Sequence, residues 1–273
     1  MPEGPSLLIA REAMISFKGK KVIAVAGNSK IDKDRMLNQK LIDIRTWGKH
    51  LLLCFKGFTI RIHFLMFGTY RVNEKKEGAT PRLSLVFSKG EINFYTCAVK
   101  LLEEPLDEIY DWSADVLSEE WNAAAAIKKL KAMPETLVTD ALLDQNIFSG
   151  VGNIIKNEVL YRICVHPKTK LGALPAKKLA SLVEEARNYS FDFLKWKKEY
   201  VLRKHWLAHT KKTCSRDGDK IIKEYLGTTN RRTFFCNSCQ VLYEKATQVK
   251  EKKKPVPAKA EKLKSTKRSI KKN

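Results

Sequence analysis

The sequence predicts a multidomain α+β protein in which an N-terminal antiparallel β-sandwich precedes a helical domain. From Lys21 to about Thr96 the chain consists of short runs rich in β-branched and aromatic residues, separated by Gly, Asn and charged turns. Beyond Ser113 the spacing of the hydrophobic residues becomes helical. The length of 273 residues also exceeds one typical domain of about 100–200 residues.

A helix is expected to flank the sandwich at the start of the chain. Four hydrophobic residues, Leu7, Ala10, Met14 and Phe17, have the spacing that buries one face of a helix from about residue 7 to residue 17. Ser6 precedes this segment and is a plausible N-cap.

The strands and helices that follow are separated by clear turn signals. Five strands are predicted, at 22–26, 51–55, 59–64, 82–87 and 91–95. Four helices are predicted after them, at 123–131, 135–143, 154–162 and 176–198. Pro175 is well placed to begin the last of these helices.

Changes in composition divide the chain into four parts. We expect a β-sandwich domain at 1–120, a helical domain at 121–208, a cysteine-bearing hairpin at 209–243 and a disordered Lys-rich tail at 244–273. The last segment contains two Pro and almost no large hydrophobic residue, so it cannot bury enough apolar surface to fold.

The charge of the chain points to a polyanionic partner inside the cell. The formal net charge is +22, with 52 Lys and Arg, which favours nucleic acid. No apolar run approaches the roughly 20 residues that span a bilayer, so no membrane association is expected. Glu3, Arg11 and Glu12 interrupt the only candidate secretion signal, which predicts a cytoplasmic, DNA-associated protein.

Three of the six cysteines lie among charged and turn residues in a metal-binding pattern. Cys214-x2-Asp217 is followed by Cys236-x2-Cys239, the spacing of a zinc ribbon with an aspartate in the second place. Three thiolates and one carboxylate predict one structural zinc per chain. His209 is an alternative fourth ligand, and a metal-free hairpin is the alternative to a metal site.

The segment from Gln145 to Ile154 joins two predicted helices through two glycines. Asn153 is placed to cap the second helix, and free amides at such a helix start can bind a phosphate of DNA. The alternative is an ordinary turn between helices.

Five motifs occur in order between Pro2 and Gln240. They are Met1-Pro2-Glu3-Gly4-Pro5, Trp47-Gly48-Lys49, His63-Phe64-Leu65-Met66-Phe67-Gly68, the block from Asp144 to Pro167, and Arg231 five residues before Cys236. In these motifs the chain resembles the formamidopyrimidine-DNA glycosylase and endonuclease VIII family, most closely the endonuclease VIII branch. The resemblance implies that the helical domain is a helix-two-turn-helix domain and the hairpin a zinc ribbon.

The resemblance also implies an activity: a base-excision-repair DNA glycosylase that is also an abasic-site (AP) lyase. After removal of Met1, Pro2 carries a secondary amine with a pKa near 8, partly neutral and nucleophilic at physiological pH. By resemblance, Pro2 forms a Schiff base with the damaged nucleotide, and β/δ elimination follows. Glu3 would transfer protons beside it.

Further roles follow from the same resemblance. Lys49 would contact the phosphate near the lesion, where the alternative is a solvated lysine. Arg231 would grip the DNA backbone with its guanidinium, and Arg232 is the neighbouring competitor. Asn153 would lie at the DNA backbone as well.

The run Leu65, Met66 and Phe67 matches the loop that fills the gap left when a base is turned out of the duplex. The alternative for a hydrophobic run after a strand is burial in the core.

The sequence departs from the family pattern at two positions. Ser6 stands where the family usually has a second glutamate, and Asp217 stands where it has a cysteine. No long Gly-rich loop of the kind that binds oxidised purines occurs between Ala186 and Cys214, which favours oxidised pyrimidines.

The expected partner is damaged double-stranded DNA, bound by a monomer without a nucleotide cofactor. Two other classes of protein fit parts of the sequence. A catalytically silent protein that binds damaged DNA would explain the charge, and a zinc-ribbon module of a ribosome or polymerase would explain the cysteines. Only an enzyme gives Pro2 and Glu3 a role.

Overall fold

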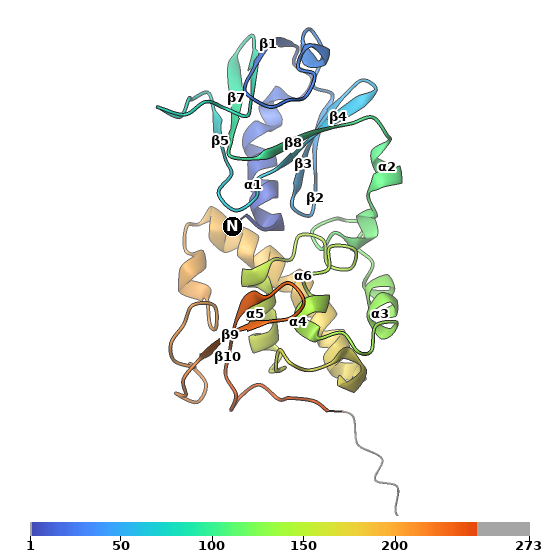
Figure 1. The fold of residues 1–273 in the computed structure, drawn as a ribbon, viewed down its shortest axis with the longest axis vertical. Coiled ribbons are helices and arrows are strands. Elements are labelled where there is room, and N and C mark those ends of the chain that lie inside the picture. The colour runs from blue at the N-terminus through green and yellow to red at the C-terminus, as the bar shows by residue number, and fades with distance from the viewer. Residues whose placement is uncertain (1, 245–273) are drawn as a thin grey trace, which may run out of the picture.

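The computed structural model describes residues 2–244, which form a β-sandwich and a helical domain joined end to end (Figure 1). The described chain begins at the junction between the two, so its N-terminal residues face both domains (Figure 1). The expected disordered tail at 244–273 lies, except for Glu244, outside the described residues. Within 2–244, none of the helices has the length and apolar character needed to cross a bilayer.

The sandwich consists of two four-stranded antiparallel sheets with the strand orders β1-β6-β7-β5 and β2-β3-β4-β8. The strands are β1 (Val22–Ala26), β2 (Asp43–Trp47), β3 (His50–Phe55), β4 (Phe58–His63), β5 (Thr69–Val72), β6 (Leu83–Phe87), β7 (Gly90–Tyr95) and β8 (Ala98–Leu102). The five predicted strands are present within about one residue at each end. The three that were not predicted, β2, β5 and β8, are edge strands with at most one fully buried residue each, so their hydrophobic signal is weak.

The first helix begins earlier than its hydrophobic pattern suggests. Helix α1 spans Gly4–Met14 and continues as a short 3₁₀ turn, Ile15–Phe17. The prediction that Ser6 caps this helix is wrong: Glu3 occupies the N-cap position and Pro5, whose fixed φ suits a first turn, lies ahead of Ser6. The four residues expected to bury one face are all in the core of the sandwich.

The helical domain contains one long helix and several short ones. Its helices are α3 (Ala123–Lys131), α4 (Val138–Ala141), α5 (Asn153–Arg162) and α6 (Ala176–Lys198), whereas α2 (Leu106–Ile109) follows the last strand of the sandwich and packs against it through Leu106. Helix α4 is a single turn, shorter than the predicted 135–143, because Asp144 begins a tight turn in which its side chain accepts a hydrogen bond from the Asn146 amide. Helices α5 and α6 pack together around a hydrophobic core separate from that of the sandwich.

A two-stranded hairpin completes the described chain. Strands β9 (Ile222–Leu226) and β10 (Arg231–Phe235) pair antiparallel, with Arg231 opposite Leu226 at the turn. Strand β10 lies along α5 (Figure 1), and a small core that includes Tyr161, Phe234 and Cys236 fixes its base. An α+β protein with a sandwich, a helical domain and a hairpin is thus confirmed.

Candidate active site

The N-terminal arm is held at the junction by close contacts between glycines. The amide of Gly4 donates to the carbonyl of Gly150 at 2.9 Å, and a Cβ on Gly4 would lie only 2.9 Å from the Gly150 Cα. Gly48, with φ +52°, also faces this turn, and its amide donates to the Asp115 carboxylate at 2.8 Å. The arm, the β2–β3 turn and the turn before α5 therefore converge, and only small residues permit the approach.

Glu3 reaches from this arm to the start of helix α5. Its carboxylate accepts hydrogen bonds from the backbone amides of Gly152 (3.1 Å), Ile154 (2.8 Å) and Ile155 (3.2 Å). Its side chain is almost fully buried, and a Cβ on Gly152 would collide with it. The anion at this helix start is thus a carboxylate of the protein itself, so the prediction that these amides are free to bind phosphate is wrong for three of them.

Burial and hydrogen bonding act in opposite directions on Glu3. Burial raises the pKa of the carboxyl group above its usual range, while the charge of Lys49 and the three amides partly offset this. The positive end of the α5 dipole lies at the same place. A buried carboxyl group with a raised pKa keeps its proton to higher pH than a free glutamate does, and it can donate that proton.

Asn153 is the first residue of α5 rather than its N-cap, a position that Gly152 occupies, so the prediction that Asn153 caps the helix is wrong. Its side-chain amide instead donates to the carbonyl of Arg232 at 2.8 Å. Asn153 therefore ties the hairpin to the helix start that holds Glu3.

Lys49 and Arg231 approach the same region from different domains. Lys49 follows Gly48 in the turn just before β3 and is half-buried. Burial and the charge of Arg231 lower the pKa of Lys49, and the charge of Glu3 partly offsets this effect. Arg231 and its neighbour Arg232 are both exposed on the hairpin. Glu3, Lys49 and Arg231 therefore interact electrostatically although they lie far apart in the sequence.

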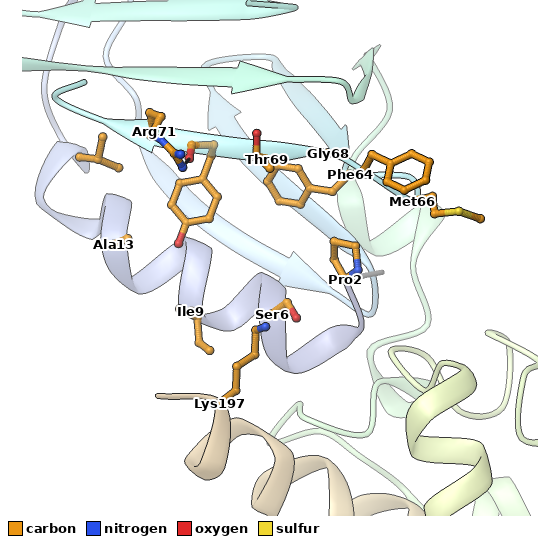
Figure 2. Close-up of a pocket in the computed structure, with 13 residues that line it drawn as sticks. Pro2, Ser6, Ile9, Ala13, Phe64, Met66, Gly68, Thr69, Arg71 and Lys197 are labelled. Atoms are coloured by element: carbon orange, nitrogen blue, oxygen red, sulfur yellow. Dashed lines mark hydrogen bonds between the residues drawn. The ribbon is translucent and has the colours of Figure 1, made fainter. Parts of the chain in front are cut away.

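A pocket of about 650 Å³ opens beside Pro2 (Figure 2). Helix α1 contributes Ser6 and Ile9 to one wall, and β5 contributes Arg71 to another. The Lys197 side chain extends from α6 toward Ser6, so both domains form the pocket (Figure 2). Apolar walls with a few polar groups and cations at the rim are typical of a site for a small planar molecule.

The loop between β4 and β5 projects its hydrophobic side chains into solvent. Leu65, Met66 and Phe67 are 50%, 52% and 75% exposed, so the alternative that this run belongs to the core is wrong. Leu65 adopts φ +51°, and its amide donates to Nδ1 of His63 at 3.1 Å. His63, which sequence reasoning did not single out, thus stabilises a strained loop that displays three apolar side chains.

Helix α5 carries three consecutive buried polar residues that the sequence analysis also missed. Lys156 donates to the Thr233 hydroxyl at 2.8 Å, and Asn157 accepts from the Phe234 amide at 3.3 Å. Glu158 accepts from three backbone amides of residues 207–209. Polar residues on a helix usually face water. The sequence contains no signal that these three side chains are instead buried against other parts of the protein.

Two family models match the chain, one for each domain. The model "Formamidopyrimidine-DNA glycosylase N-terminal domain" matches residues 1–99, and "Formamidopyrimidine-DNA glycosylase H2TH domain" matches residues 113–190. The chain belongs to the formamidopyrimidine-DNA glycosylase and endonuclease VIII family. The resemblance of its motifs to this family is confirmed.

Relatives of this family member include two endonuclease VIII-like proteins. It is 31% identical over 214 residues to "Endonuclease 8-like 3" of Mus musculus, a match that covers 76% of this chain and 35% of that protein. It is 33% identical over 196 residues to "Endonuclease 8-like 2" of Bos taurus, covering 66% of this chain and 58% of that protein. The chain thus spans between about a third and three fifths of the length of these relatives.

Solved structures share the fold of this glycosylase-family chain. A viral DNA glycosylase superposes with a TM-score of 0.77 at 21% identity, covering 88% of this chain and all of that one. A Lactococcus lactis formamidopyrimidine DNA glycosylase bound to DNA with an abasic site gives 0.76 at 20% identity, covering 87% and 99%.

The base of the hairpin in this family member brings four metal-binding side chains together. The ligand atoms of Cys214, Asp217, Cys236 and Cys239 all lie within 4.8 Å of one another. The sulfurs of Cys214 and Cys239 are 3.7 Å apart, and the Cys236 sulfur is 3.2 Å from an Asp217 oxygen. These separations agree with the roughly 3.8 Å between sulfurs that Zn–S bonds of about 2.3 Å produce in a tetrahedron.

His209, the alternative fourth ligand, lies outside this cluster. Its Nδ1 is 3.0 Å from the side-chain nitrogen of Asn157, and its ring packs edge-on against Trp206 and Phe234. Burial lowers the His209 pKa to about 4, which keeps the imidazole neutral in this contact. The geometry therefore favours Asp217 as the fourth metal-binding residue.

Proposed function

We propose that this chain is a base-excision-repair DNA glycosylase and AP lyase that uses the imino nitrogen of Pro2 as its nucleophile. The observation that carries the proposal is the pairing of Pro2, at the mouth of a pocket, with the buried Glu3 carboxylate bound to the start of α5. A frayed chain end would not bury a carboxylate on three backbone amides. The names of the matching relatives support the same activity.

In the glycosylase step, the neutral Pro2 nitrogen attacks C1′ of the damaged nucleotide and the bond from C1′ to the base breaks. Glu3 donates a proton to O4′ as the C1′–O4′ bond breaks and the sugar ring opens, and the base leaves with the electrons of its bond to C1′ and gains the proton that the Pro2 nitrogen loses. A Schiff base between Pro2 and C1′ results. The raised pKa of Glu3 keeps part of the population protonated for this step.

In the lyase step, the positively charged Schiff base withdraws electrons from the neighbouring carbon. Glu3, now ionised, takes the proton from C2′, and the 3′ phosphate leaves by β elimination. Loss of the 5′ phosphate by δ elimination follows, and hydrolysis of the Schiff base frees Pro2. One carboxyl group thus alternates between acid and base.

Other residues position the DNA. Lys49 and Arg231 would bind phosphates on either side of the lesion, and Asn153, bonded to the same hairpin, would support the backbone contact. The exposed side chains of Leu65, Met66 and Phe67 would enter the gap left by the displaced base. The substrate is damaged double-stranded DNA, acted on by a monomer inside the cell without a nucleotide cofactor.

The pocket beside Pro2 would receive the displaced base. Its walls are mainly apolar, and Arg71 and Lys197 offer donors to ring carbonyls. Ser6 occupies the position of a family glutamate and leaves this wall without a carboxylate. Oxidised pyrimidines, which carry several carbonyl groups, fit such a pocket.

One zinc ion would be held by Cys214, Asp217, Cys236 and Cys239. The separations between their ligand atoms suit tetrahedral coordination. The zinc-ribbon assignment of the hairpin rests on this donor set. Bound zinc would supply structural stability at the base of the hairpin, five residues from Arg231.

The test is reductive trapping on DNA with a single abasic site. Borohydride should convert the Schiff base into a stable covalent adduct of Pro2 with the DNA. A matched preparation in which residue 2 is preceded by a retained Met1, or is acetylated, should give no adduct and no strand scission. Full scission by the blocked protein would refute the mechanism. DNA binding without any adduct from a Met-free preparation would favour a catalytically silent damage-binding protein.

A further inference from the structure

Lys156 is a fully buried lysine in the part of the molecule that links Glu3 to the hairpin. Its side chain has no exposed surface and is among the largest fully buried side chains of the described residues. It lies on α5 one residue beyond Ile155, whose amide binds the Glu3 carboxylate. Lysine is almost never fully buried unless it has a specific partner, so this position requires an explanation.

The partner of Lys156 belongs to strand β10. The Nζ atom donates to the Thr233 hydroxyl at 2.8 Å, and that hydroxyl donates to the carbonyl of Arg231 at 3.1 Å. Thr233 is also fully buried. A continuous chain of hydrogen bonds thus runs from the interior of α5 to the residue proposed to bind DNA phosphate.

The charge of Lys156 decides which group donates and which accepts in these two hydrogen bonds. An ammonium can only donate, so the Thr233 oxygen must accept from it and the Thr233 proton is free to reach the Arg231 carbonyl. A neutral amine can accept instead, and the Thr233 proton can then turn away from Arg231. The arrangement in which Lys156 donates to Thr233 and Thr233 donates to Arg231 is the one that a charged lysine requires.

The groups facing Lys156 come from four parts of the fold. Glu3 and Asp140 favour its charged form, and Arg231 opposes it. His209, which is neutral at physiological pH, also interacts electrostatically with Lys156. Because burial outweighs the carboxylates, the pKa of Lys156 is lowered to about 7.

We propose that Lys156 is a positioning residue of the glycosylase site, whose buried ammonium orients Arg231 through Thr233 and places a positive charge behind the Glu3 carboxylate. The inference rests on the proposed function, since it concerns how that site is held. It assigns a role to a lysine that contacts neither the DNA nor the reacting atoms.

The experiment compares Lys156→Met with wild type in single-turnover base excision from a duplex containing one oxidised pyrimidine. Methionine keeps the length and burial of the side chain but removes the donor and the charge. The control is Lys177→Met, which removes an exposed lysine from α6. Losing a charged hydrogen bond predicts excision about tenfold slower or worse in Lys156→Met, with Lys177→Met unchanged.

The pH dependence separates this role from simple packing. The contribution of Lys156 is present while it is charged and is lost as pH rises through its pKa. The ratio of wild-type to Lys156→Met rates should therefore be largest near about pH 6 and fall toward about pH 9, whereas a packing defect lowers the rate equally at every pH. A pH-independent ratio, or a rate equal to that of Lys177→Met, overturns the proposal.

A second variant covers the case in which Lys156→Met does not fold. Thr233→Val keeps the shape of the side chain and removes only the hydroxyl that links Lys156 to Arg231. It should slow excision and weaken duplex binding, and unchanged behaviour overturns the proposal. If wild-type protein itself gives no borohydride adduct with abasic DNA, the proposed function fails; if wild type reacts and both variants match it, only the role of Lys156 fails.

Discussion

Glu3 shows how a single residue joins the N-terminal arm to the helical domain. Its carboxylate binds amides about 150 positions away in the sequence, at the N-terminal end of α5. The hydrogen bonds and the helix dipole favour the ionised form, yet burial is the larger effect and raises the pKa. The folded protein therefore holds Glu3 at a cost in stability whenever the group is ionised.

This cost predicts a pH-dependent effect of Glu3→Gln on stability. Because the folded pKa of Glu3 is raised above that of the unfolded chain, its favourable contribution is present below about pH 4.3 and is lost as pH rises through the folded pKa. As pH rises through the folded pKa of Glu3, the free energy of unfolding of the wild-type protein should thus fall relative to that of Glu3→Gln. Urea unfolding of both proteins from acid to neutral pH measures it, and Glu108→Gln, an exposed change on α2, is the control.

The same substitution should separate stability from activity. Glu3→Gln removes the proton-transfer group, so base excision should fall by about 100-fold or more while the protein stays folded. Single-turnover kinetics on a lesion duplex measures the change. A variant that excises at the wild-type rate would show that another group transfers the protons.

At the level of elements, the hairpin is held in position by contacts along β10, at its base and at its turn. The α5 side chains of Asn153, Lys156 and Asn157 hold β10 from one side, while Cys214, Asp217, Cys236 and Cys239 close its base. The β9–β10 turn itself lies near α4, where the Thr228 amide donates to Asp140 at 3.0 Å. Arg231 is thus presented by a short element that has little core of its own.

A change in the metal ligands should therefore act on DNA binding before it acts on the fold. Cys236→Ser is expected to lower zinc content well below one per chain and to weaken DNA binding by about tenfold or more, because Arg231 loses its support. Asp217→Cys should instead hold zinc more tightly against a chelator. Elemental analysis and DNA titration measure both, and a Cys236→Ser protein that is free of zinc but binds DNA normally would contradict the coupling.

At the scale of the whole molecule, the positive charge is spread between the folded domains and the residues after 244. A net charge of +22 produces a field that attracts DNA regardless of its sequence. The described chain begins between the sandwich and the helical domain (Figure 1), and Glu3 binds the start of α5 there. We therefore expect the distributed charge to attract DNA in general and the proposed site residues to recognise the lesion.

Removal of residues 245–273 should reduce attraction without changing the chemistry. These residues are rich in Lys and Arg, so the truncated protein should bind DNA more weakly at low salt and show a shallower dependence of affinity on salt. The rate of base excision at saturating protein should stay the same. Anisotropy titrations between about 50 and 200 mM salt measure the slope; an unchanged slope would show that the segment does not contact DNA.

The sequence by itself determined the elements whose signals are local. Helices α3 and α6 have the predicted bounds, because a helical period and a starting Asn or Pro act within a few residues. The motifs predicted roles for Pro2 and Glu3 from residue types alone, and the spacing of the cysteines predicted the cluster of ligand atoms that the structure contains. The edge strands β2, β5 and β8 were missed, and α4 is shorter than predicted, because the formation of these elements depends on their neighbours in space.

Only the tertiary structure decided how the candidate residues are arranged. The Glu3 carboxylate binds the amides that the sequence had predicted to bind phosphate. His209 contacts Asn157 and lies outside the cysteine cluster, and Lys156 is buried against the hairpin. Each of these contacts joins residues at least 50 positions apart. Such pairs form because elements far apart in the sequence pack together and bury them, and a local pattern of residues contains no information about which partner burial will supply.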